Sequence, residues 1–196
     1  MAKHRSSSLA SSQSGFTLTE IFVVVLILGV VLAIAVPNYS SLVNGGRLTG
    51  TANELLASYQ MARIEAIRRG QRVVVCPSTD GASCGLDWSR GWLVFEDRNR
   101  DDVVSLGEQV ITVGSPPPGV QLLPSPAVTL SQRIRFSPDG FARVPVTGAL
   151  LDARIAVCQP VTRPEENIRD VVLASGSRSS VLRRNGAGAC VAPANT

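Results

Sequence analysis

One carboxylate stands out because of the residues around it. Glu20 is the single charged residue between Gly15 and Val36, and every residue from Ile21 onward in this stretch is apolar or glycine. Bringing an isolated carboxylate into a lipid-like environment costs roughly 3 kcal/mol even on mild insertion scales. The penalty falls when the charge finds an opposite partner. Glu20 is therefore predicted to pair with a positive group.

Residues that could catalyse a reaction or hold a metal are scarce. The only histidine is His4, close to the N-terminus, which removes Ser-His-Asp and Cys-His schemes and most metal hydrolysis from the rest of the chain. The sequence has no phosphate-binding loop. We therefore expect no enzymatic activity, no cofactor and no metal.

An acidic loop at residues 96–102 is the nearest approach to a metal site. Such a loop can resemble a calcium site, but this one lacks the spaced Asp-x-Asp-x-Asp-Gly pattern. A solvated hairpin tip is the favoured interpretation.

Four cysteines form the next chemically distinct group: Cys76, Cys84, Cys158 and Cys190. An even number in a domain that looks exported indicates disulfides and an oxidising compartment, either the periplasm or the cell surface. Four cysteines allow three pairings. We favour Cys76 with Cys84, which closes a local loop, and Cys158 with Cys190, which ties down the C-terminal tail. A zinc site is the alternative, but it would lack both Cys-x-x-Cys and a histidine.

The stretch 169–184 is locally basic, although the chain as a whole carries a net charge of only +4. It sets four arginines against one acid: Arg169, Arg178, Arg183 and Arg184, with Asp170. DNA binding through Arg178, Arg183 and Arg184 is one hypothesis. Few aromatic residues interleave the stretch, so such binding would use phosphates and depend strongly on salt. A solvated basic edge strand that resists aggregation is the favoured alternative.

Two kinds of element must position these residues. Residues 1–15 form a basic, serine-rich leader, and residues 16–46 are expected to be helical. The 21 residues from Phe16 to Val36 approach the length of about twenty needed for a membrane span. The basic N-terminal flank predicts that the C-terminal part lies outside the cytoplasm. Pro37 lacks a backbone donor and is expected to kink the helix.

Residues 47–69 return to a helical spacing, and Gly70 is a stop signal. The apolar residues expected on or near one face are Leu48, Leu55, Leu56, Tyr59, Ala62, Ala66 and Ile67. This face should pack on the domain that follows.

The region 72–196 has short apolar segments separated by turns, a pattern typical of antiparallel sheet. Strands are expected at 72–76, 92–95, 109–113, 121–123, 133–136, 142–146, 154–159, 170–174 and 180–183. Residues 137–140, Ser-Pro-Asp-Gly, predict a hairpin turn.

The sequence Gly-Phe-Thr-Leu-Thr-Glu at 15–20, followed by sixteen apolar residues and Pro37, resembles the class III signal of type IV pilins and type II secretion pseudopilins. The resemblance implies that a prepilin peptidase cleaves between Gly15 and Phe16 and methylates Phe16. It also implies that Glu20 pairs with the N-terminal amine of a neighbouring filament subunit. Thr19 departs from the usual aliphatic residue. An ordinary signal anchor or secretory signal is the alternative, and it leaves Glu20 unexplained.

Further motifs are similar to the GspH/FimT branch of minor pilins and pseudopilins. They lie at 62–70, 73–81, 91–95 and 136–140, so the likeness covers most of the chain up to about residue 145. It implies an α+β, pilin-like fold in which a long N-terminal helix packs on antiparallel sheets. Some FimT-type minor pilins take up DNA through a Gly-Arg-x-Arg motif, and only Arg178 aligns in the nearest match at 175–180.

The resemblance implies three segments: a removed leader (1–15), a membrane and filament-core helix (16–46), and a periplasmic domain (47–196). We expect a minor pilin that assembles into or initiates a type IV pilus. A GspH-type pseudopilin of a type II secretion system is the alternative, and a competence-type DNA receptor is the alternative of another class. Expected partners are prepilin peptidase, other major and minor pilins or pseudopilins, inner-membrane lipid before assembly and, on the receptor hypothesis, DNA.

Overall fold

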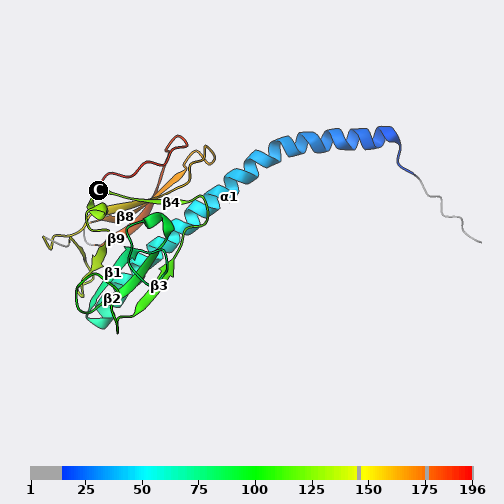
Figure 1. Ribbon diagram of the computed structural model, residues 1–196. Coiled ribbons are helices and arrows are strands. Elements are labelled where there is room, and N and C mark those ends of the chain that lie inside the picture. Colours follow the sequence, from blue (N-terminus) through cyan, green and yellow to red (C-terminus); the bar gives the residue numbers. More distant parts are fainter. Residues whose placement is uncertain (1–14, 145–146, 175–176, 196) are drawn as a thin grey trace, which may run out of the picture. The chain divides into compact units, whose positions relative to one another are not determined.

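The computed structural model describes residues 15–144, 147–174 and 177–195, apart from the side chains at 34 and 36–38. The chain divides into two compact units after Tyr39. The long helix α1 (Leu18–Arg69) contributes residues to both units (Figure 1).

The first unit contains the start of α1. Thr17 caps this end, because its side-chain oxygen and its carbonyl both accept the Glu20 amide, at 3.3 and 3.1 Å. A carboxylate in the first turn also interacts favourably with the helix dipole. The apolar side chains that follow are exposed, for example Leu26 at 55%.

Among the residues that the structure describes, none of the helices combines the length and the apolar character that crossing a membrane requires. This finding does not confirm the span expected at residues 16–46. The expected kink at Pro37 concerns a side chain that lies outside the described residues.

In the second unit, the last part of α1 buries one narrow stripe. Its fully buried members recur every three or four residues, as one face of a helix requires: Leu48, Ala52, Leu55, Tyr59, Ala62 and Ala66. The predicted face was wrong at Ile67, which is 52% exposed. Gly70 ends the helix with a φ of +62°, a conformation that glycine adopts without strain.

In the described part of the chain, nine strands form two antiparallel sheets. The first sheet has the order β3-β2-β1-β5-β6 and the second has the order β4-β7-β8-β9. The strands of the first sheet are β1 (Arg72–Pro77), β2 (Trp92–Asp97), β3 (Val110–Gly114), β5 (Ile134–Phe136) and β6 (Ala142–Arg143). Those of the second are β4 (Gln121–Pro124), β7 (Ala153–Cys158), β8 (Ile168–Ala174) and β9 (Arg178–Arg184).

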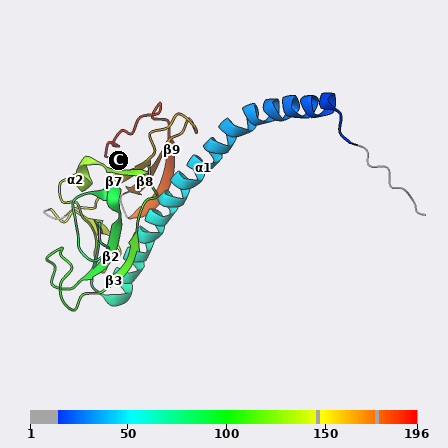
Figure 2. The same ribbon diagram turned by 45° about the vertical axis from the view of Figure 1, so that its right-hand side comes forward.

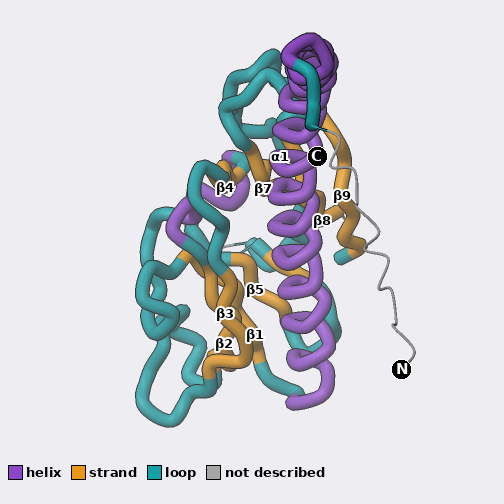
Figure 3. The backbone as a smooth tube through the Cα atoms, turned by 90° about the vertical axis from the view of Figure 1, so that its right-hand side faces the viewer, coloured by secondary structure: helices purple, strands orange, loops and turns teal. Residues whose placement is uncertain are grey.

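The buried stripe of α1 joins the inner faces of both sheets in one core. That core includes Trp92, Phe136, Ile155 and Val171. Figure 3 shows this part of α1 lying across the strands, and β9 runs beside the helix in both Figure 2 and Figure 3.

Each sheet also buries part of its outer face beneath a disulfide. Cys76 and Cys84 are joined, and Cys76 packs with Val74 and Phe95 on the outside of the first sheet. Cys158 and Cys190 are joined over the outside of the second sheet. These are the two pairings favoured from the sequence. Burial on both faces explains the unbroken valine run in β1, since such strands do not alternate.

Two short elements were not anticipated from the sequence: a 3-10 turn η1 (Trp88–Arg90) and a helix α2 (Pro126–Thr129). The expected strand at 142–146 is described only as β6, because residues 145 and 146 lie outside the described part. The predicted hairpin turn is present, with the Gly140 amide donating to the Ser137 carbonyl at 2.8 Å.

Two loops at the edge of the first sheet are held together by one side chain. Arg133 donates hydrogen bonds of 3.2 Å to the carbonyl of Gly85, beside the first disulfide, and to the carbonyl of Asp102, in the acidic loop. Burial lowers the pKa of Arg133.

Candidate functional site

The predicted processing and assembly residues lie at the start of α1. Gly15 and Phe16 precede the helix in non-helical backbone, and Phe16 is 76% exposed. Glu20 is exposed in the first turn, and no ion pair of its carboxylate is found among the described residues. The three residues thus lie together on an accessible segment.

The basic residues predicted for DNA are all on β9, the edge strand of the second sheet, but the structure does not gather them. Arg184 lies six positions after Arg178, or about 20 Å along a strand. Arg184 donates two hydrogen bonds to buried Asp170, at 2.8 and 3.1 Å, and these raise the pKa of Arg184. Arg183 lies 3.6 Å from Glu166.

Arg169, the fourth arginine of this stretch, supports the fold. It is buried, donates to the carbonyls of Glu166 and Ile168, and lies 3.4 Å from the Thr49 hydroxyl on α1. Its burial lowers the pKa of the Arg169 guanidinium. Of the three arginines predicted for DNA binding, Arg178 alone lacks an acidic partner among the described residues. Ser175 and Gly176, from the motif match, lie outside those residues.

The fold brings another cation close to Arg178. Arg63 of α1 donates a 3.3 Å hydrogen bond to the carbonyl of Ser177, and both arginines line one cavity. No sequence signal marks Arg63, because only the packing of β9 beside α1 makes Arg63 and Arg178 neighbours. In the sequence of β9, polar residues flank the apolar pair that begins with Val181. This mostly polar pattern could have indicated that Arg178 lies on an edge strand.

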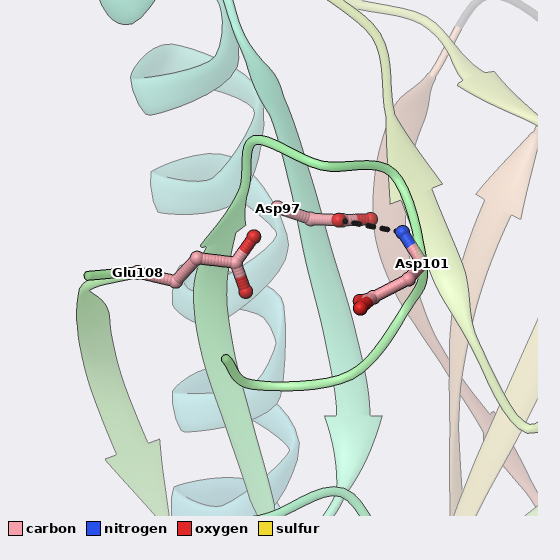
Figure 4. A group of neighbouring side chains, drawn as sticks. All are labelled: Asp97, Asp101 and Glu108. Carbon is pink, nitrogen blue, oxygen red and sulfur yellow. Dashed lines mark hydrogen bonds between the residues drawn. The ribbon is translucent and has the colours of Figure 1, made fainter. Parts of the chain in front are cut away.

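Two carboxylates of the acidic loop, those of Asp97 and Asp101, lie close to the carboxylate of Glu108 (Figure 4). Their oxygens lie within 4.8 Å of one another. Asp97 is fully buried and accepts a hydrogen bond from Arg72 at 2.7 Å and another from the Asp101 amide at 3.2 Å.

The carboxylates of Glu108 and Asp101 accept hydrogen bonds from nearby backbone amides. Glu108 accepts from the amides of Arg98 and Ser105, at 2.9 and 3.0 Å. Asp101 accepts from the amide of Val103 at 2.8 Å, and this bond lowers the pKa of Asp101. The protein's own donors thus engage the carboxylates, an arrangement that supports a self-structured hairpin tip.

Comparisons with known proteins agree with this architecture. A family model described as type II transport protein GspH matches residues 51–188. The pilin-like protein PilA1 of Thermus thermophilus is 32% identical over 146 residues, which cover 71% of this chain and 86% of that protein.

A solved structure of a similar protein shows the same fold. The type IV minor pilin FimU of Pseudomonas aeruginosa matches with a TM-score of 0.50 and 19% identity, covering 69% of this chain and 87% of FimU. The minor pseudopilin EpsH from the type 2 secretion system of Vibrio cholerae gives a TM-score of 0.48 and 12% identity, covering 70% and 97%. The chain belongs to the GspH family, and it is a minor pilin or pseudopilin of the GspH/FimT type with an α+β, pilin-like fold.

Proposed function

We propose that this chain is a minor pilin that assembles into or initiates a type IV pilus. In this proposal it is held in the inner membrane with its C-terminal domain in the periplasm. Prepilin peptidase then cleaves it after Gly15 and methylates Phe16, and it joins other major and minor pilins. One observation carries the proposal: Glu20 is exposed, without an ion pair among the described residues, at the head of an exposed apolar helix.

The proposed role of Glu20 is to pair with the amine of Phe16 in a neighbouring subunit. A carboxylate and an amine that enter an apolar filament core together attract strongly, whereas removing one leaves the other buried and unpaired. Correct addition of a subunit is thereby favoured over misplaced addition.

The test compares Glu20→Ala and Glu20→Gln with the matched control Thr19→Ala, which changes the neighbouring residue without removing a charge. Subunit content in purified filaments from the native host is expected to fall at least about tenfold for both Glu20 variants and to stay unchanged for the control. Mass analysis of the mature N-terminus should give methylated Phe16 in the wild type. Normal incorporation of Glu20→Gln would rule out the charge-pairing role.

A GspH-type pseudopilin of a type II secretion system is the alternative. The description of PilA1 as pilin-like supports a pilus, whereas the description of the matching family model supports secretion. Deleting the gene in the native host separates the two. Loss of surface pili with normal secretion is expected, and loss of secretion with normal pili would favour the pseudopilin.

DNA binding for uptake is the second candidate function, and the exposed side chains of Arg178 and Arg183 on an edge strand favour it. It is the weaker candidate because Arg184 is paired with Asp170. A mobility-shift assay at low salt would compare the wild type with Arg178→Ala and Arg183→Ala. The absence of a wild-type shift would exclude this function.

A further inference from the structure

A cavity of about 580 Å³ lies where α1 meets β5, β8 and β9. Its volume falls within the range of about 300 to 1,000 Å³ that is usual for small-molecule sites. Residues far apart in the sequence line it, among them Tyr59, Arg63, Ile64, Phe136, Leu173 and Arg178.

The floor of this cavity is apolar and rigid. Phe136 and Leu173 are each 1% exposed, and the rings of Phe136 and Tyr59 pack at a centroid distance of 6.5 Å. Ile64 adds an apolar side chain that is exposed. Ile64 therefore offers the apolar surface that a ligand can reach, and Phe136 and Leu173 close the floor beneath it.

Two cations complete the lining. Within the described chain, neither Arg63 nor Arg178 has a carboxylate partner, and the hydrogen bond recorded for Arg63 goes to the Ser177 carbonyl. Arg183 and Arg184, on the same strand as Arg178, each lie beside an acid. At the cavity, β9 therefore begins with a positive charge, that of Arg178, that no carboxylate of the described chain offsets.

Tyr59 supplies an independent sign of a missing partner. Its side chain is 2% exposed and lines the cavity, yet no hydrogen bond satisfies its hydroxyl among the described residues. Burial raises the pKa of Tyr59, so the hydroxyl keeps its proton and remains a donor. A buried donor without an acceptor is unfavourable, and a ligand oxygen would relieve this penalty.

We propose that this cavity binds a carboxylate carried on an apolar body. The apolar part would lie against Ile64, above the floor that Phe136 and Leu173 close, and Arg63 and Arg178 would hold the carboxylate. Tyr59 would donate a hydrogen bond to a ligand oxygen. The ligand is either a free organic acid or the C-terminal residue of a peptide, since both present this chemistry.

A nucleic acid fits the same features less well. Aromatic rings in the described part of the second unit are buried or half-buried, so bases would find no exposed stacking surface there. Arginine forks match a carboxylate with two hydrogen bonds, and the buried apolar floor has no counterpart in a phosphate chain.

The experiment uses the full chain in a neutral detergent and measures affinity by calorimetry. The probes are 3-phenylpropanoate and an N-acetylated peptide ending in leucine, each compared with its amide. At least one carboxylate should bind, and its amide should bind about tenfold more weakly or worse. The stronger binder of the two identifies the source of the ligand. Binding by neither carboxylate, or equal binding of acid and amide, would overturn the proposal.

Substitutions of the lining residues test whether the probe binds in this cavity. Arg63→Gln and Arg178→Gln should each weaken binding about tenfold, whereas the matched control Arg183→Gln, at the other end of β9, should bind like the wild type. Tyr59→Phe should also bind more weakly while unfolding at the same temperature as the wild type or higher, because the lost hydroxyl had no partner. Wild-type affinity in both Arg63→Gln and Arg178→Gln would contradict the proposal. So would an oligonucleotide that displaces the probe and loses affinity in the same two variants.

Discussion

The two units of this protein differ in how far their apolar side chains are buried and in whether their carboxylates form ion pairs. In the N-terminal unit, apolar side chains such as Leu26 and Phe22 are more than half exposed, and Glu20 has no ion pair among the described residues. In the C-terminal unit, apolar side chains fill a core and buried carboxylates pair with arginines. The packed core therefore stabilises the second unit, whereas the exposed apolar surface of the first fits its proposed contacts with other subunits.

The largest expected effect comes from the disulfides, which should matter only to the C-terminal unit. Cys158–Cys190 spans 32 residues and Cys76–Cys84 spans 8. Loop-closure entropy predicts a loss of about 4 kcal/mol for the double variant Cys158→Ser/Cys190→Ser and about 2.5 kcal/mol for Cys76→Ser/Cys84→Ser. Chemical denaturation measures both losses. If both variants had the same unfolding free energy as the wild type, the two disulfides would not stabilise the domain.

A pair of identical substitutions tests the comparison directly. Leu55 is fully buried and Leu26 is 55% exposed. Leu55→Ala should lower the unfolding free energy of the domain by about 3 kcal/mol, because it leaves a cavity. Leu26→Ala should leave that free energy unchanged and instead reduce incorporation into filaments. Equal destabilisation by the two variants would show that both leucines belong to one core.

Acid should weaken the C-terminal unit through its buried carboxylates. Hydrogen bonds from Arg98 and then Arg69 lower the pKa of Glu96, and bonds from Arg68 and Arg69 lower the pKa of Glu65. A lowered folded pKa stabilises the protein above the unfolded value of about 4.3, and this stabilisation is lost as the pH falls through the folded value.

Thermal unfolding between pH 7 and pH 3 measures this loss. The variant Glu96→Gln should unfold at a lower temperature at neutral pH and change less as the pH falls. If the unfolding temperature of this variant fell as steeply with pH as that of the wild type, Glu96 would not contribute to the acid sensitivity.

The smallest effect is expected at the surface of the same unit. Arg143 and Asp139 pair at 2.5 Å, but their side chains are 37% and 44% exposed. Water screens such pairs, so Arg143→Gln should change stability by less than about 1 kcal/mol. Chemical denaturation would detect a larger loss, which would place this hairpin among the parts that hold the domain together.

Local patterns predicted most of the fold. The end of α1 at Arg69, the segments that form β1, β2 and β8, and the turn before Gly140 all carry signals within a few residues. The sequence also favoured the cysteine pairs that the structure joins. The role of Ile67 was predicted wrongly because helical spacing alone does not define the edge of a buried face.

The candidate binding residues were predicted less completely, because they depend on long-range pairing. Asp170 and Arg184 lie on neighbouring strands, and the sequence does not specify the register that brings them together. Arg63 and Arg178 share a cavity only because β9 packs beside α1. The run of arginines therefore looked like one basic surface, although the fold separates it into paired and unpaired cations.

Arg133 joins the loop of the first disulfide to the acidic loop, through the carbonyls of Gly85 and Asp102. One guanidinium therefore fastens two hairpin tips. Replacing Arg133 would therefore remove a contact from both tips at once, so a protease should cut both more readily in an Arg133→Ala variant than in the wild type.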